Sequence, residues 1–329
     1  MDSTDLRMAR WMYRDGVWVP WGVDPRVTPT EIGRRVGLGR QAVWARIRAW
    51  RKEGFFRPYE VRPNYGLFGV ELQQVDLHLA DPSDARDLMD ELELVDGVTS
   101  AWVGQGDTAS AESVWRCSVC FVENHGRPTE RRMRMFRRLA TGRIADGPFA
   151  YSLPEVSHPL TALDWRILEA LRANPCASLT RVARQLRITL KTLIRRRDAL
   201  LEAHAVWYFP QFDWSKHPSV ALRIFYDRSR ELSAISRDVE DRYPDLLPMS
   251  LADIGYYRHE LASASFFGVR VPAPSPDNVQ GIMTDVAEVP GVTRVRSDLQ
   301  GAWRYYSRWV DGALAGRRLG PAPPIDTGS

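Results

Sequence analysis

A stretch of 25 residues occurs twice in this chain, 150 positions apart, and this repetition most limits the folds available to it. The first copy, from Thr28 to Lys52, reads TPTEIGRRVGLGRQAVWARIRAWRK, and the second begins at Ser178 without any gap in the alignment. The aligned positions keep an N-capping residue, the apolar spacing and a basic face. They include Leu38/Ile188, Val43/Leu193, Arg46/Arg196 and Trp50/Leu200. A match of this length predicts an internal duplication.

Each copy predicts two short helices joined by a tight turn. In the first copy Thr28 is a good N-cap and Glu31 completes a capping box. Gly37-Leu38-Gly39 ends the first helix and supplies the turn. The second helix then carries one apolar stripe at helical spacing, namely Val43, Ile47 and Trp50. This pattern is typical of a helix-turn-helix, whose second helix enters the DNA major groove.

Further elements flank both copies. Asp5 to Tyr13 predicts a first helix, and its counterpart is Leu163 to Leu171. Strand-like residues follow each second helix, and we expect a short β-hairpin there, which would make each unit winged. Arg57 and Arg62 are candidates for phosphate contacts from the first wing, or are plain surface arginines.

Positive charge is concentrated on the repeated stretches. The whole chain has a net charge of only +4, with 45 Lys and Arg against 41 Asp and Glu. Residues 24–60 and 174–210 each have a clear excess of basic residues, so the remainder is acidic. A solvated basic face explains any single run of this kind. Two runs at matched positions favour phosphate binding.

The segments between the repeated stretches change character and predict strands and helices in the order βαββαβ. In the first half these are strands near Val75–Leu79, 98–103, 114–122 and 149–153, with helices at 82–94 and 129–139. The second half repeats the order with strands at 220–226, 248–254, 263–271 and 292–297, and helices at 231–243 and 276–286. This order is the ferredoxin-like arrangement.

The expected fold class is therefore α+β, with two winged helix-turn-helix domains and two ferredoxin-like domains that form a pseudo-dimer. The predicted boundaries are 1–62 and 154–213 for the winged units, 63–153 and 214–315 for the ferredoxin-like units, and 316–329 for a disordered Gly/Pro-rich tail. An added short helix is expected from Trp303 to Leu314.

The cysteines do not predict a disulfide framework, because there are only three. Cys117 and Cys120 form a CxxC motif inside a predicted strand, where a spacing of three places the two thiols on opposite faces. Buried structural cysteines are the favoured interpretation. A zinc pair completed by His125 is the alternative, although a second half-site is missing.

A winged helix-turn-helix followed by a βαββαβ domain resembles the Lrp/AsnC family of transcriptional regulators. The residues that support the resemblance are Leu163-Asp164, Ile167-Leu168, Leu171, Ser178-Leu179, Val182-Ala183, Arg195-Arg196, Val286 to Val292 and Asp96-Gly97-Val98. The resemblance covers nearly the whole chain, twice. It implies DNA binding by the winged units, and pairing and effector sensing by the ferredoxin-like units, with an amino acid or another metabolite as the effector.

In this family two chains normally pair, so the resemblance implies an intramolecular pseudo-dimer here, with further association into homo-oligomers. The family's effector loop follows the second strand of the ferredoxin-like unit. The matching positions are Gly104, Gly106, Asp107, Gly255 and Tyr256. The first loop lacks the family's aromatic residue and second acid, and the second lacks both acids, so plain turns are the alternative.

The predicted double-stranded DNA contacts lie on the exposed faces of the two second helices. They are Arg40, Gln41, Trp44, Ala45, Arg46, Arg48, Lys191, Thr192, Arg195 and Arg196. Arg40 suits guanine and Gln41 suits adenine, while Arg46 and Arg48 are expected to hold phosphates. Trp44 either contacts the DNA or packs against the wing. Because the two helices differ, the site should be an imperfect palindrome.

An enzyme is the alternative, since relatives with this two-unit architecture resemble siroheme decarboxylases. Arg258 and His259 would then act on a tetrapyrrole. We expect no enzyme, because no other catalytic constellation, phosphate-binding glycine loop or metal cluster stands out. No cofactor or metal is expected. The sequence has no long uncharged apolar run, so we expect a cytoplasmic protein without membrane association.

Overall fold

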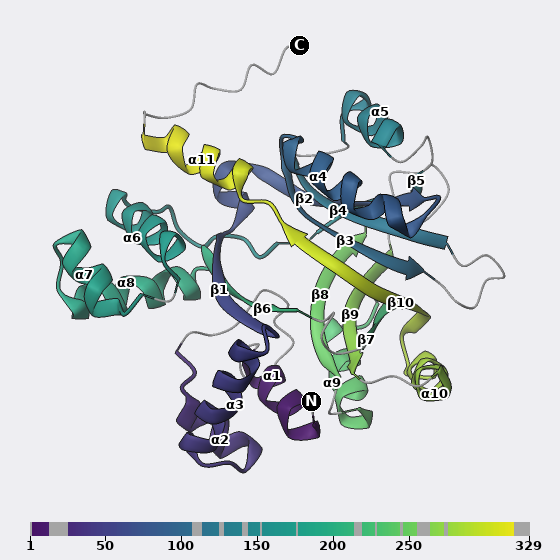
Figure 1. Ribbon diagram of the computed structural model, residues 1–329, viewed down its shortest axis with the longest axis horizontal. Helices are drawn as coiled ribbons and strands as arrows, with labels where there is room; N and C mark the ends of the chain where they lie inside the picture. The colour runs from purple at the N-terminus through teal and green to yellow at the C-terminus, as the bar shows by residue number, and fades with distance from the viewer. Residues whose placement is uncertain are drawn as a thin grey trace.

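The computed structural model describes residues 2–12, 26–106, 114–124, 128–139, 144–151, 153–175, 177–213, 219–227, 229–243, 246–254, 264–272 and 276–318. Two groups of three helices lie beside an eight-stranded sheet, and a two-stranded ribbon runs between the two groups (Figure 1). The expected α+β class with a winged helix-turn-helix is confirmed. The predicted domain boundaries stay a prediction.

The two helical groups have matching elements. The first contains α1 (Ser3–Met12), α2 (Pro29–Val36) and α3 (Arg40–Lys52), and the second contains α6 (Ala162–Ala173), α7 (Leu179–Leu186) and α8 (Leu190–Glu202). The side chains of Thr28 and Ser178 accept hydrogen bonds from the backbone N–H groups of Glu31 and Arg181, at 3.2 and 3.3 Å. Both residues therefore cap their helices as the sequence predicts.

The second helix of each group ends in a left-handed residue. This is Gly37 in α2, with φ 75°, and Arg187 in α7, with φ 56°. A glycine adopts this backbone freely, whereas an arginine pays about 1–2 kcal/mol for it. The second turn is therefore strained where the first is not.

We expect Arg187→Gly to stabilise the protein by about 0.5–1 kcal/mol, because glycine adopts the left-handed backbone without strain. Glycine also raises the entropy of the unfolded chain, which offsets part of the gain. The opposite substitution at the matched position of the first unit, Gly37→Arg, should destabilise the protein by about 1 kcal/mol. Urea unfolding followed by circular dichroism measures both. Equal unfolding midpoints for wild type and Arg187→Gly would contradict the expectation.

The wing differs from the expected pair of local hairpins. Each half supplies one strand, β1 (Phe56–Pro63) or β6 (Val206–Phe212), and the two pair with each other in antiparallel register. Within the described residues neither half adds a second strand at this place, so each strand satisfies its backbone groups on the other half. The wing is one ribbon shared by both halves.

Side chains of the ribbon also cross between the halves. Phe212 of β6 packs on Trp50 at the end of α3, with ring centroids 6.1 Å apart, and on Phe55 at 5.0 Å. In the other direction, Arg172 of α6 donates to the backbone oxygen of Val61 in β1 at 3.4 Å. The two helical groups are thus held in one hydrophobic core with the ribbon.

The large sheet contains two ferredoxin-like strand orders side by side. Its order is β5-β2-β4-β3-β10-β7-β9-β8. The strands are β2 (Val70–Leu79), β3 (Val98–Gly106), β4 (Val114–Asn124), β5 (Ile144–Ala150), β7 (Ser219–Tyr226), β8 (Leu247–Ile254), β9 (Ala264–Pro272) and β10 (Val292–Tyr305). The remaining elements are η1 (Tyr65–Phe68), η2 (Pro82–Asp84), α4 (Ala85–Leu94), α5 (Glu130–Leu139), α9 (Leu232–Arg242), α10 (Pro276–Ala287) and α11 (Arg308–Arg318). The expected βαββαβ order is observed in each half.

Strand β10 joins the two halves. Its first part pairs with β7, and its second part, from Asp298, pairs with β3 of the first half. At the opposite ends of the strand order, β5 and β8 lie against each other, so the sheet curls on itself. The expected helix at 303–314 begins later than predicted, because Trp303 is held in the strand opposite Trp102.

Helix α11 extends to Arg318, so residues 316–318 are helical, in contrast to the predicted tail, and residues 319–329 lie outside the described part. The helix is anchored on both halves. Val310 and Leu314 are buried in the core shared with α6, and Tyr306, just before it, donates to the backbone oxygen of Met89 at 2.8 Å. The C-terminal helix therefore ties the first half of the sheet to the second helical group.

The two faces of the sheet differ, because one is apolar and the other combines apolar core residues with buried polar ones. Helices α4 and α5 cover an apolar face of the first half that includes Val75, Leu77 and Phe121, and α9 and α10 cover the equivalent face of the second half. The inner face carries buried polar residues. Among them Arg223 of β7 donates to Asp76 of β2 at 2.9 Å, across the two halves.

This inner ion pair sits in a small polar network. Gln74 donates to Asp76 at 2.7 Å, and Arg116 lies 4.0 Å from the same carboxylate. Burial alone raises the pKa of the Asp76 carboxyl, but the guanidinium groups of Arg223 and Arg116, with hydrogen bonds from Ser118 and Gln74, hold the pKa below its ordinary value. The carboxylate is thus charged and compensated inside the protein.

We expect Arg223→Met to destabilise the protein by about 3–5 kcal/mol, because it leaves Asp76 charged and buried with less compensation. The double variant Asp76→Leu, Arg223→Met should recover most of that loss. Urea unfolding at pH 7 measures both, and a single variant as stable as wild type would contradict the assignment.

The pair also sets a pH dependence. The pKa of Asp76 is lower in the folded than in the unfolded chain, so its stabilisation is complete above pH about 4 and is lost as the pH falls through the folded value. We expect the double variant to lose less stability than wild type on acidification below pH 4. Parallel acid titrations followed by tryptophan fluorescence test this.

The two cysteines of the CxxC motif lie on opposite faces of β4, as predicted. Cys117 packs in the core under α4 and α5, and Cys120 packs in the core shared with the helical groups. Burial raises the pKa of the Cys117 thiol to about 12 and that of Cys120 to about 11. His125 lies outside the described residues. The described residues contain no cluster of metal-ligating side chains.

Candidate nucleic-acid interface

Helix α3 buries one stripe and exposes the other, which decides where its basic residues point. Val43, Ile47 and Trp50 have exposed fractions of 0, 6 and 4%, as predicted. The opposite face is turned to solvent and contains the predicted Arg40, Gln41, Ala45 and Arg48. Trp44 is half-buried and packs against the main core on one side.

Within the described residues, the Arg40 and Arg48 side chains have no salt bridge or hydrogen bond. The same holds for the exposed Lys52 at the end of the helix. Arg51 lies over the ring of Phe56, 5.5 Å from its centroid, and remains exposed. The exposed face of α3 thus presents four cations that are not neutralised by any described carboxylate.

Arg46 is in a different environment from the other predicted contacts. Its guanidinium donates to Asp5 at 2.7 Å and to Asp2 at 2.9 Å, both from α1 or its start. Hydrogen bonding to Asp5 and then to Asp2 raises the pKa of Arg46. The side chain expected to hold a phosphate therefore links α3 to α1.

The second unit repeats this link. Arg196, 150 positions after Arg46, lies 3.3 Å from Asp164 of α6, and Asp164 is the counterpart of Asp5. The carboxylate also accepts from the N-cap Thr161. Sequence reasoning assigned both arginines to DNA contacts, although the recurrence of both the acid and the base in the aligned copies was a visible signal of the pairing.

The predicted DNA-contacting residues of α8 differ in their exposure and in their partners. Lys191 and Arg195 are exposed and form no salt bridge or hydrogen bond within the part of the chain that the structure describes. The Thr192 hydroxyl is 2.9 Å from that of the N-cap Thr189, so it supports the helix start. Arg197, which aligns with the buried Ile47 of α3, is buried and pairs with Asp198 at 2.8 Å.

The wing arginine Arg62 is not placed for a phosphate contact. It is buried, pairs with Glu60 at 2.7 Å, and lies over the rings of Tyr305 and Phe209, 3.7 and 4.7 Å from the centroids. The side chain of Arg57 is outside the described part. The two-stranded ribbon is a structural connector in this region.

Two of the predicted effector residues belong to the described part of the chain, and both lie in a strand. Gly104 and Gly106 lie in strand β3, where they pair with β10 and β4, and not in a loop as expected. The strand continues because partners on both edges satisfy its backbone groups. Asp107, Gly255 and Tyr256 lie outside the described residues, as do Arg258 and His259 of the enzyme alternative.

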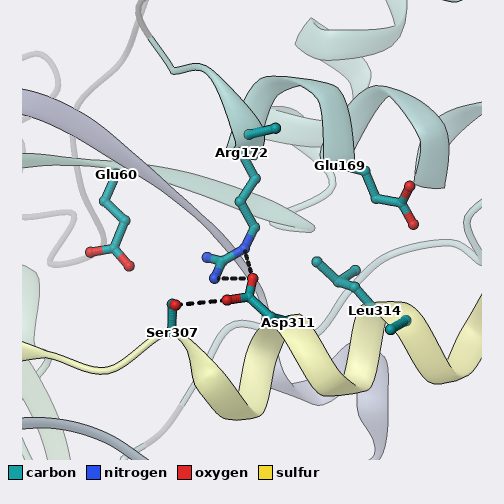
Figure 2. A pocket seen from close by; sticks show the side chains of 8 residues that line it. Glu60, Glu169, Arg172, Ser307, Asp311 and Leu314 are labelled. Carbon is teal, nitrogen blue, oxygen red and sulfur yellow. Dashed lines mark hydrogen bonds and ion pairs between the residues drawn. The ribbon is translucent and has the colours of Figure 1, made fainter.

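A pocket of about 500 Å³ lies elsewhere, between β1, α6 and α11. Figure 2 shows Arg172 facing Asp311, to which it donates at 2.8 and 3.1 Å, while Ser307 donates to the other oxygen of Asp311 at 2.6 Å. Glu60 and Glu169 also line it. Burial alone raises the pKa of Asp311, but hydrogen bonds from Ser307 and Arg172 hold it below its ordinary value. Neither Gly104 nor Gly106, the two predicted effector residues that the structure describes, lines this pocket.

The comparisons with known proteins agree with the local geometry. A model of winged helix-turn-helix DNA-binding domains matches residues 160–206, which span α6, α7 and α8. The chain therefore contains a winged helix-turn-helix. No curated relative matches its sequence.

Solved structures with a similar course of the chain include both regulators and an enzyme. The siroheme decarboxylase NirDL is 11% identical, with 96% of this chain and 100% of that chain covered and a TM-score of 0.49. The leucine response regulatory protein LrpA of Mycobacterium tuberculosis is 24% identical over 43% of this chain and 86% of its own, with a TM-score of 0.28. AsnC of E. coli is 17% identical over 44% and 93%, with a TM-score of 0.28. The described part of the chain has no helix long and apolar enough to span a membrane.

We expect Arg46→Ala to lower the free energy of unfolding by about 1 kcal/mol, because it removes the link from α3 to α1. The matched control Arg48→Ala should leave the stability within about 0.5 kcal/mol, because that side chain is exposed. Urea unfolding of the two variants tests this assignment, and identical losses of stability would refute it.

Proposed function

We propose that this protein is a sequence-specific regulator of transcription that binds double-stranded DNA with α3 and α8 of the same chain. The observation that carries the proposal is the set of exposed cations at the starts and along the outer faces of both helices, namely Arg40, Arg48, Lys191 and Arg195. They lie on the side of each helix that is opposite its buried stripe, and this is the side that would enter the DNA major groove.

The shared ribbon supports simultaneous binding of both helices. Because β1 and β6 pair along their length, the two helical groups are connected without a second chain. A homodimeric regulator obtains two recognition helices by symmetry, while this chain carries both itself. We propose that one molecule occupies two half-sites, and that further association into homo-oligomers is not required for this step.

A tandem duplication accounts for the matched details of the two units. Both have the N-cap, the left-handed helix end and the ion pair between the first and third helices. We propose that each copy corresponds to one Lrp/AsnC-like chain, divided at the boundaries that the sequence predicts. A small-molecule effector, an amino acid or another metabolite, remains part of the proposal.

The enzyme alternative needs cations that hold the carboxylates of a tetrapyrrole. On the inner face of the sheet, Arg223 donates to Asp76 and Arg116 lies beside the same carboxylate, so these two charges are compensated internally. We therefore propose a regulator and not a decarboxylase. A visible-light titration with siroheme tests the alternative, since a saturable shift of its absorption band would favour the enzyme.

Selection from random duplexes followed by gel shift at two salt concentrations tests the proposal. We expect Arg48→Ala and Arg195→Ala each to weaken binding and to reduce the slope of log K against log salt by about 0.9, as one phosphate contact is lost. Arg134→Ala on α5 is the matched control, because that arginine is exposed but belongs to the sheet-covering helix. Binding to no duplex at low salt, or equal effects of all three changes, would reject the function.

A further inference from the structure

The exposed faces of α3 and α8 carry different chemistry at matched positions. Both helices have 13 residues and the same buried stripe, so positions 150 apart occupy the same place on each surface. The exchanges on the exposed side are Arg40 to Leu190, Gln41 to Lys191, Trp44 to Ile194, Ala45 to Arg195, Arg48 to Asp198 and Lys52 to Glu202. Three of these positions lose a cation, two of them in exchange for an acid, and two positions gain a cation.

Internal pairing makes the contrast larger. On α8, Arg196 is paired with Asp164 and Arg197 with Asp198, while the acid Glu202 lies 3.2 Å from Arg26. Two cations remain on its outer surface within the described residues, Lys191 and Arg195. The outer face of α3 carries four, which are Arg40, Arg48, Arg51 and Lys52.

Leu190 takes the place of Arg40 at the first position of α8. It is 41% exposed, and only it and Leu94 are large hydrophobic residues classed as exposed in the described part of the chain. An exposed leucine needs no explanation by itself. This one sits at the helix start, where side chains reach base edges, and adjoins the cationic Lys191.

We infer that the two recognition helices read half-sites of different chemistry. This inference rests on the proposed function. Helix α3 supplies most phosphate contacts and hydrogen bonds to bases through Arg40 and Gln41. Helix α8 supplies fewer phosphate contacts and recognises thymine, whose C5-methyl group is the apolar feature of the major groove, through Leu190.

The test replaces thymine by deoxyuridine, which lacks only the methyl group, in the duplex obtained by selection. The half-site of α8 is identified first, as the half that loses hydroxyl-radical protection in the double variant Lys191→Ala, Arg195→Ala. Replacing its thymines should weaken wild-type binding about fourfold, the effect of one lost methyl contact. Replacement in the other half-site should have a smaller effect.

The Leu190→Ala variant should bind the thymine duplex about fourfold more weakly and should no longer distinguish thymine from deoxyuridine. Leu94→Ala is the control, because Leu94 is exposed at the end of α4 and far along the chain from both recognition helices. It should retain the wild-type discrimination. Circular dichroism confirms that both variants fold.

The salt dependence of binding independently tests the difference in phosphate contacts between the two helices. Neutralising the four cations of α3 should reduce the salt slope by about 3.6, and neutralising the two of α8 by about 1.8.

Binding without any loss on deoxyuridine substitution, a selected α8 half-site that contains no thymine, or unchanged discrimination in Leu190→Ala would overturn the inference while leaving the proposed function intact. Failure to bind any duplex would instead overturn the function itself, and the inference with it.

Discussion

Backbone hydrogen bonding between the two halves is the constraint on which the rest of this structure depends. β1 and β6 would each be a single exposed strand if its half folded alone, and β3 would be an exposed edge. Unpaired strand edges are unfavourable when buried and prone to aggregation when exposed. The chain satisfies them internally, through the ribbon and through β10, so its two halves are parts of one folding unit.

That constraint also positions the surface proposed to meet DNA. Phe212 of the second half packs under Trp50 of the first, while Arg172 of the second reaches the first half's β1. The recognition helix α3 therefore packs on a strand of the other half, while in the second group it is α6, the helix before the helix-turn-helix, that contacts β1 of the first half. A change in the relative position of the halves of the sheet would be transmitted to the spacing of α3 and α8, and the proposed effector would act on the proposed DNA binding by this route.

The arginines of each helical group have two different roles, and the sequence alone does not show which arginine has which role. Arg46 and Arg196 face a carboxylate on the first helix and hold the group together. Arg48 and Arg195, only two positions later or one earlier on the same helices, face solvent. A helix advances about 100° per residue, so neighbouring arginines on one helix point in different directions and serve different purposes.

The sequence by itself determined the local structure: the caps at Thr28 and Ser178, the buried stripe of α3, the order of strands and helices, and the opposite faces of Cys117 and Cys120. These follow from periodicity and from contacts within a few residues. Only the tertiary structure decided that β1 pairs with β6, that β10 runs on to β3, that Gly104 and Gly106 are strand residues, and that Arg46 faces Asp5. Those outcomes depend on partners 40 to 200 residues away, and no local pattern specifies which distant group a free edge or a charged side chain will meet.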